Sequence, residues 1–211
     1  MFFILIIFVE SIAGFIALLP MIALFHFVML KQDKNKNIKT AIPHIIATYI
    51  FCLALLSILS ATGIPNIYSL KVDLAINLVP FIDIFTNYVQ YIQNILLFIP
   101  LGFLLPMLWK KFENKYLTFI CGALFSLSIE IIQIFSFRST DIDDLLMNTA
   151  GTICGYLLFM WIKRIFPKIS IFSIEDTNHL KREPYFYFIF VWLSMLFIQT
   201  FISNWLWSFI L

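Results

Sequence analysis

FFILIIFVESIAGFIALLPMIALFHFVML, residues 2–30, decides the fold of this chain. The run contains one charged residue, Glu10. It is longer than the roughly 20 residues that a helix needs to cross a hydrocarbon core of about 30 Å. It is also about twice as long as the apolar region of a signal peptide, and it lacks a small-residue cleavage pattern. The run therefore predicts a transmembrane helix.

The composition extends this membrane character to the whole chain. Hydrophobic residues make up 62% of the 211 residues and charged residues 12%, with a mean hydropathy of +0.96. Soluble domains are about half apolar and a quarter charged. The apolar residues form continuous runs, whereas a membrane β-barrel shows short alternating segments. We predict an all-α, polytopic integral membrane helix bundle. The net charge of +2 indicates no polyanionic partner, so we expect no nucleic acid to bind.

About six transmembrane helices are predicted within a single membrane domain, residues 1–211. Their spans lie near residues 2–30, 41–62, 88–109, 116–137, 145–166 and 185–211. The segment from Gly63 to Asn87 is apolar but is interrupted by Pro65, Pro80 and Asp83. It is too broken to span, so we expect it to lie in the interface or to dip into the membrane.

The basic residues predict the orientation. Twelve of the fourteen Lys and Arg residues follow the first, third and fifth spans, and the positive-inside rule places these loops in the cytoplasm. These twelve are Lys31, Lys34, Lys36, Lys39, Lys110, Lys111, Lys115, Lys163, Arg164, Lys168, Lys181 and Arg182. Both termini are then extracytoplasmic, with Trp205 and Trp207 in an outer aromatic belt.

Polar residues gather where the third, fourth and fifth spans meet the outer surface. Ser126, Glu130 and Gln133 form one stripe of the fourth span at i, i+4, i+7. Asn94 and Asn148 lie at a similar depth on the third and fifth spans. All these side chains fall within the outermost ~10 Å of the membrane.

Small residues continue the stripe on the fifth span. Asp144, Asn148, Gly151 and Gly155 follow at steps of four, three and four, and Gly122 extends the stripe of the fourth span. Small residues allow close helix packing in lipid. We therefore expect the fourth and fifth spans to pack against each other.

Glu130 is the sharpest candidate, because a carboxylate in lipid must be protonated, paired or turned toward protein or water. Arg138 or an amide of Gln133, Asn94 or Asn148 is a candidate partner. The residue is either functional or part of a buried clasp between helices. Glu10 and Gln199 are further intramembrane polar groups, and either could face the same cluster.

The loop RSTDIDD, residues 138–144, has an ordinary structural interpretation. Thr140 and Asp143 fit a capping box, and Asp141, Asp143 and Asp144 would lie at the positive N-terminus of the fifth span. Three aspartates exceed what a cap needs, but no EF-hand spacing is present, and we expect neither a metal nor a cofactor. His26 and His44 lie at the cytoplasmic ends of the first two predicted spans and His179 in a cytoplasmic loop, so a Ser-His or Cys-His nucleophilic site at the outer cluster is disfavoured.

Several of these elements together resemble the VanZ-like family of bacterial membrane proteins. They are NLVPF (77–81), NILLFIPLGFLLP (94–106), SLSIEIIQ (126–133) and RSTDIDDLLMNTAGTICG (138–155). The family pattern is N-x3-F-x-P-x-G, E-x-x-Q and R-x-x-D-x-x-D followed by N-x-x-G-x3-G, and it covers about residues 75–160. It includes Pro100, which can kink the third span, and Gly102.

The resemblance implies a multi-pass protein of a Gram-positive-type cell membrane with a role in the cell envelope. The family is named for a protein that confers antibiotic resistance, at a low level, to the glycopeptide teicoplanin. On this interpretation the binding residues are Asn94, Ser126, Glu130, Gln133, Arg138, Asp141, Asp143, Asp144 and Asn148, with Pro100, Gly102, Gly151 and Gly155 as structural residues.

Three functions remain open from the sequence. The first is a non-enzymatic protein whose outer polar cluster binds a lipoglycopeptide, a cell-wall precursor lipid or a partner protein. The second is a membrane-embedded enzyme that uses carboxylates on an envelope lipid or isoprenoid carrier. The third is a small transporter, which is disfavoured because no repeat symmetry is evident.

Overall fold

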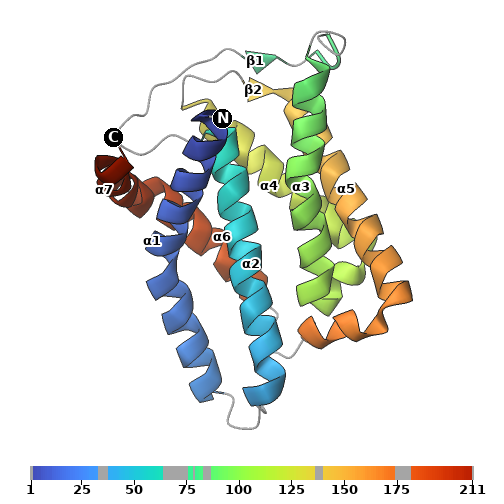
Figure 1. Cartoon of the computed structure of the whole chain (residues 1–211). Coiled ribbons are helices and arrows are strands. Elements are labelled where there is room, and N and C mark those ends of the chain that lie inside the picture. The colour runs from blue at the N-terminus through green and yellow to red at the C-terminus, as the bar shows by residue number, and fades with distance from the viewer. Residues whose placement is uncertain are drawn as a thin grey trace. The chain divides into compact units, whose positions relative to one another are not determined.

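The computed structural model describes residues 2–32, 38–63, 76–77, 79–82, 87–135, 140–173 and 182–210. These residues form seven α-helices and three short helical segments (Figure 1). Among the described residues, six helical stretches are long and apolar enough to cross a membrane, and the last of them is Glu183–Phe209. The protein is therefore an all-α, multi-pass membrane protein, as the composition predicts.

The helices group into two compact units. One unit contains Met1–Ile67 and Asp176–Leu211, and the other contains Tyr68–Glu175. In the first unit α1 (Phe2–Gln32) packs against α2 (Ile38–Thr62). We call the two the terminal unit and the central unit.

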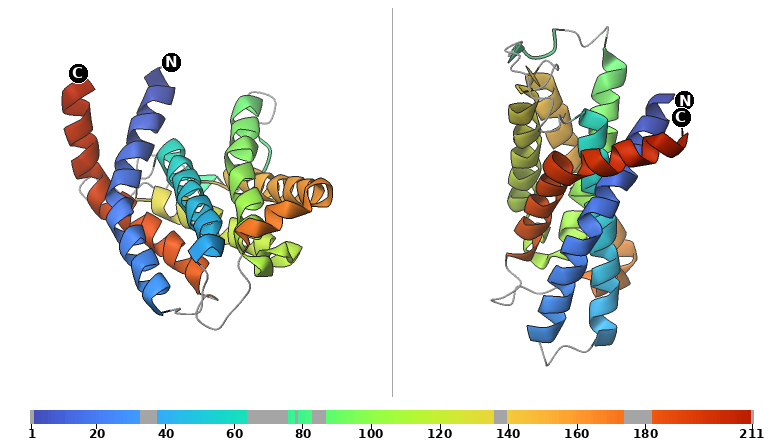
Figure 2. Two further views of the ribbon diagram at one scale, coloured as in Figure 1. Left: turned by 60° about the horizontal axis from the view of Figure 1, so that its bottom comes forward. Right: turned by 90° about the vertical axis from the view of Figure 1, so that its left-hand side faces the viewer.

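The last span of the terminal unit is not one regular α-helix. It consists of α6 (Glu183–Leu193), a π-helical segment η3 (Ser194–Ile198) and α7 (Gln199–Ile210), which form one continuous bent rod beside α1 (Figure 2). The Ser194 hydroxyl donates to the Gly14 carbonyl of α1 at 3.1 Å. The span predicted near 185–211 is confirmed as Glu183–Phe209, but its π-helical segment was not predicted, because hydrogen bonds of the π type leave no sequence pattern of their own.

Glu10 is the centre of one polar network in the terminal unit. The Glu10 carboxylate accepts hydrogen bonds from Gln199, from the Ser203 hydroxyl at 2.7 Å and from the Trp207 indole at 3.0 Å. These three donors lie on one stripe of α7 at steps of four. Glu10 and Gln199 thus face each other across α1 and α7.

A second polar network of the terminal unit joins three helices. His44 Nε2 lies 3.1 Å from Glu183 Oε1, and Tyr187 donates to the same oxygen at 2.9 Å. His26 Nε2 in turn lies 2.8 Å from the Tyr187 hydroxyl. All four side chains are buried. Both histidines are therefore engaged inside the terminal unit.

The central unit is built around α5 (Ile142–Ile165), which packs against α3 (Tyr88–Leu108) and α4 (Lys115–Gln133) (Figures 1 and 2). Two short 3-10 segments belong to this unit: η1 (Lys110–Glu113) lies between α3 and α4, and η2 (Pro167–Phe172) follows α5. Compared with the predicted spans, α4 ends four residues earlier and α5 begins three residues earlier. Asp143 and Asp144 are therefore part of the first turn of α5.

Glycines bring α3 and α5 into backbone contact and let α4 approach α5 closely. A Cβ atom on Gly151 or Gly155 would overlap the Ile95 or Ile99 carbonyl of α3. A Cβ atom on Gly102 would overlap the Thr152 carbonyl. The expected packing of α4 on α5 is present, but Gly151 and Gly155 face α3 rather than α4. On α4 it is Gly122 that leaves room for α5, at the Thr152 side chain.

Two short strands of the central unit pair with each other, one before α3 and the other directly before α5. The strand β1 (Ile76–Asn77) pairs in parallel with β2 (Thr140–Asp141), with Ile76 opposite Thr140 and Asn77 opposite Asp141. This pairing ties part of the expected interfacial segment to the residues that precede α5.

Gly155→Ala should destabilise the central unit by about 1–3 kcal/mol, because its methyl group has no room beside the α3 backbone. Leu157→Ala is the matched control on the same helix, since Leu157 is 58% exposed, and it should change stability by about 0.5 kcal/mol or less. Thermal unfolding in detergent measures both. Equal midpoints for the two variants would show that the seam of small residues does not hold α5 in place.

Candidate functional site

The first turn of α5 brings three aspartates to one end of the central unit. Asp141 is the N-cap residue, and its side chain accepts the Asp143 backbone N–H at 2.9 Å. Asp143 and Asp144 lie in the first turn, where the helix dipole favours negative charge. The predicted capping box of Thr140 and Asp143 is wrong, because the helix begins one residue later than that pattern requires. An aspartate caps as well as a threonine does.

Asp143 holds a tight turn that follows β1. Both of its carboxylate oxygens accept the Phe81 backbone N–H at 2.9 Å, and the Tyr91 hydroxyl donates to Oδ2 at 2.6 Å. Asp143 is only 3% exposed, so these donors take the place of water around its carboxylate. Asp143 therefore links α5 to α3 and to the turn.

Asp144 points to α3 instead. Its Oδ1 atom accepts the Asn94 amide at 2.6 Å and the Gln90 amide at 3.1 Å. The structure thus pairs Asn94 with Asp144, rather than with the fourth span. Charge-assisted hydrogen bonds of this kind are stronger than those between neutral groups.

Glu130 is buried, with 4% exposure, near the end of α4. Its Oε2 atom accepts the backbone N–H of Asp141 at 3.1 Å, and the Thr140 hydroxyl donates to its backbone carbonyl at 3.2 Å. The partner seen for this carboxylate is therefore a backbone group of β2, and not one of the amide side chains expected from the sequence. Arg138, the other candidate partner, lies outside the described residues.

A second layer of polar groups lies one turn deeper. The Asn148 amide donates to the Ser126 hydroxyl at 2.9 Å, which joins α5 to α4. Asn148 is 2% exposed, and its Oδ1 atom has no hydrogen-bond partner among the described residues. Gln133 is also buried, at 4% exposure. The predicted site residues thus form two layers: the carboxylates and Asn94 lie near the helix ends, and the Asn148–Ser126 pair lies below them. Gln133 is the last residue of α4.

Several residues of the site were not predicted. The Asn77 amide donates to Asp141 Oδ2 at 3.3 Å, and Phe81, Tyr91 and Gln90 contact the aspartates as described. Asn87, Gln90 or Tyr91, and Asn94 follow one another at helical spacing, so extending the stripe from Asn94 toward the start of α3 would have found them. For Asn77 and Phe81, the only indication in the sequence was that both belong to the motif NLVPF.

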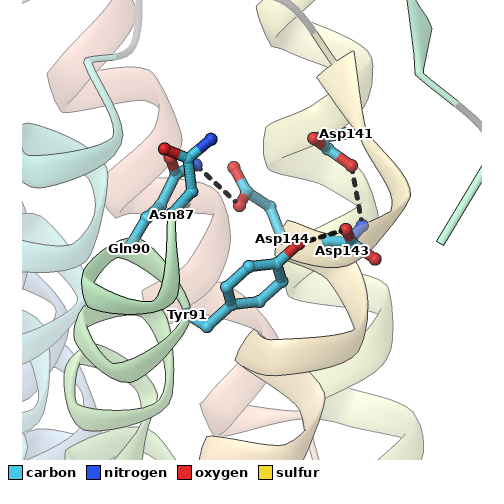
Figure 3. Close-up of a pocket in the computed structure, with 6 residues that line it drawn as sticks. All are labelled: Asn87, Gln90, Tyr91, Asp141, Asp143 and Asp144. Atoms are coloured by element: carbon cyan, nitrogen blue, oxygen red, sulfur yellow. Dashed lines mark hydrogen bonds between the residues drawn. The ribbon is translucent and has the colours of Figure 1, made fainter. Parts of the chain in front are cut away.

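The aspartates line a small open pocket together with residues from the start of α3 (Figure 3). Its lining residues are Asn87, Gln90, Tyr91, Asp141, Asp143 and Asp144. Its cavity volume of about 20 Å³ has room for about one water molecule. In Figure 3 the Tyr91 ring and the Gln90 side chain reach from α3 toward the aspartates of α5.

The chemistry of the pocket is that of a hydrogen-bond acceptor. Three carboxylates face it, and none of its lining side chains is a histidine, cysteine or lysine. Within the described residues, no group of three or more His, Cys, Asp or Glu side chains is arranged to hold a metal ion. The arrangement suits a ligand that offers N–H or O–H donors or a positive charge.

Comparison with known proteins adds a family assignment. A family model described as VanZ/LLP1 matches residues 15–164. The chain is also 39% identical over 88 residues to Protein VanZ of Enterococcus faecium, an alignment that covers 40% of this chain and 52% of that protein. The chain thus matches about half the length of this relative. No solved structure matches the chain significantly.

Glu130→Leu should destabilise the central unit by about 1–3 kcal/mol, because the Asp141 N–H loses its acceptor in a half-buried position. Glu130→Gln keeps an oxygen in the same place and should cost less. Thermal unfolding and amide exchange at Asp141 measure the effect. If the two variants had the same unfolding midpoint and the same amide exchange rate at Asp141, the hydrogen bond from Glu130 to β2 would not be what stabilises this end of α4.

Proposed function

Because the chain belongs to the VanZ/LLP1 family, we propose that it is a cell-envelope membrane protein that lowers susceptibility to the glycopeptide teicoplanin without chemical catalysis. The proposed mechanism is binding at the outer polar cluster. Its ligand is the polar part of the lipoglycopeptide, the headgroup of a cell-wall precursor lipid or a partner protein.

The observation that carries a binding role is the state of the aspartates. Asp141, Asp143 and Asp144 each accept hydrogen bonds from other parts of the central unit. A catalytic acid or base needs access to the reacting proton in a site that also holds the substrate. A pocket with room for about one water does not enclose a lipid or a sugar. This favours a surface on which a polar group docks.

The polarity of the pocket favours one part of the proposed ligands. The carboxylates of the pocket repel a phosphate group, whereas they attract the N–H groups of an amine or an amide. The docking group is then a donor-rich or cationic portion of the ligand. Asp144 is central to this proposal, because it lines the pocket from α5 and is 2.6 Å from Asn94 on α3.

Expression in a glycopeptide-susceptible Gram-positive host tests the proposal. We expect the minimal inhibitory concentration of teicoplanin to rise more than that of vancomycin, since teicoplanin carries an acyl chain and vancomycin does not. Asp144→Asn should remove the difference. Loss of a charged residue at the centre of an interface typically weakens binding about tenfold or more.

Glu113→Gln is the matched control, since it makes the same chemical change in η1, at the opposite end of the central unit. It should retain the resistance at an equal amount of protein in the membrane fraction. Equal protection against both drugs, or full protection by the Asp144→Asn variant, would contradict the proposal.

A further inference from the structure

The turn after β1 presents a row of apolar side chains on the surface. Val79 is 57% exposed, Phe81 44% and Ile82 60%, and Pro80 between them is also exposed. Soluble surfaces seldom carry contiguous apolar side chains without a partner. We call residues 79–82 the apolar turn.

The apolar turn is held in an unfavourable backbone conformation. Phe81 has a φ of 63°, and it is the one non-glycine residue with positive φ in the part of the chain that the structure describes. A bulky residue in this region costs free energy, so the surrounding contacts must enforce it. A strained backbone at an exposed aromatic residue indicates that the position of that residue matters.

Hydrogen bonds from both sides enforce this conformation. The Phe81 N–H donates to both oxygens of Asp143 at 2.9 Å, and the Val79 N–H donates to Asn77 Oδ1 at 3.1 Å. Asn77 is itself fixed by its hydrogen bond to Asp141. The polar groups of the turn therefore point into the central unit, and its apolar side chains point out.

The apolar turn lies beside an exposed apolar surface at the start of α3. The start of α3 exposes Tyr88 at 58%, Val89 at 51% and Ile92 at 51%, and Leu96 follows at 59% one turn further along. This helix is one of the membrane spans. The Phe81 ring lies 6.5 Å from the Tyr91 ring of the same helix, so the turn sits beside the first turns of α3.

We propose that residues 79–82 form a membrane-contacting element that inserts its apolar side chains among the acyl chains of the leaflet in which α3 begins. The occupant is the lipid surface itself. Asp143 acts as the positioning residue, because its carboxylate fixes the backbone at Phe81. This role does not depend on teicoplanin resistance, and it assigns a purpose to the strained residue.

Depth-dependent fluorescence quenching tests the insertion directly. The variant Phe81→Trp is reconstituted in vesicles of phosphatidylcholine brominated either near the headgroup or near the chain end. The chain contains five tryptophans, so the difference from the wild type isolates the added indole. Interfacial segments bury their apolar face roughly 5–10 Å below the headgroup boundary. We therefore expect stronger quenching by the lipid brominated near the headgroup, and little quenching by aqueous iodide. Strong iodide quenching without quenching by brominated lipid would overturn the proposal and indicate a water-exposed docking surface.

A second comparison tests the positioning role. Asp143→Asn in the Phe81→Trp background removes the charge that binds the Phe81 N–H and should shift quenching from brominated lipid toward iodide. Glu113→Gln in the same background is the matched control, since it makes the same kind of chemical change in η1, at the opposite end of the central unit; it should leave the quenching unchanged. An unchanged pattern in the Asp143→Asn variant, or equal losses in both variants at unaltered helix content, would overturn the role of Asp143.

Discussion

A carboxylate at the edge of an apolar helix bundle must find hydrogen-bond donors, and in the central unit this requirement connects both strands with α3, α4 and α5. Asp141 binds β1, Asp143 binds the apolar turn and Tyr91, and Asp144 binds the amides of α3. Glu130 adds α4 through the backbone of β2. The four acidic side chains thus join β1, the apolar turn, α3 and α4 to β2 and the start of α5. The charges that look out of place in so apolar a chain are the links that organise it.

These links depend on how closely the helices approach one another. The glycines of α5 and Gly102 of α3 allow backbone contact, which fixes the position of α5 along the axis of α3. Gly151 lies two turns after Asp144 on α5, and Ile95 directly follows Asn94 on α3, so the close approach of Gly151 to the Ile95 carbonyl helps to bring Asp144 and Asn94 together. In lipid no hydrophobic driving force favours one helix register over another, so small residues and polar pairs must define it together.

The sequence predicted the membrane class, the number of spans and the gathering of polar residues, because hydropathy and helical spacing are local properties. Partners depend on tertiary contacts and were predicted less well. Nothing in the spacing shows that Glu130 binds a backbone N–H of β2, since a two-residue strand pair has no periodicity. The capping residue was misplaced by one position, because Thr140 and Asp141 are both good caps. The π-helical segment of the last span was not predicted, because such a segment leaves no sequence pattern of its own.

The apolar turn and the acidic pocket share one residue, and this has a chemical consequence. Asp143 binds the turn through the Phe81 N–H and lines the pocket beside Tyr91. An apolar surface and a surface of hydrogen-bond acceptors are therefore held next to each other by the same carboxylate. A molecule that touches both must carry an apolar chain and a donor-rich head, which describes an amphiphile at the membrane surface. A soluble polar ligand would gain only the second contact. We therefore expect affinity to depend on the acyl chain of the ligand, because the turn places hydrocarbon beside the acidic pocket that α3 and α5 line together.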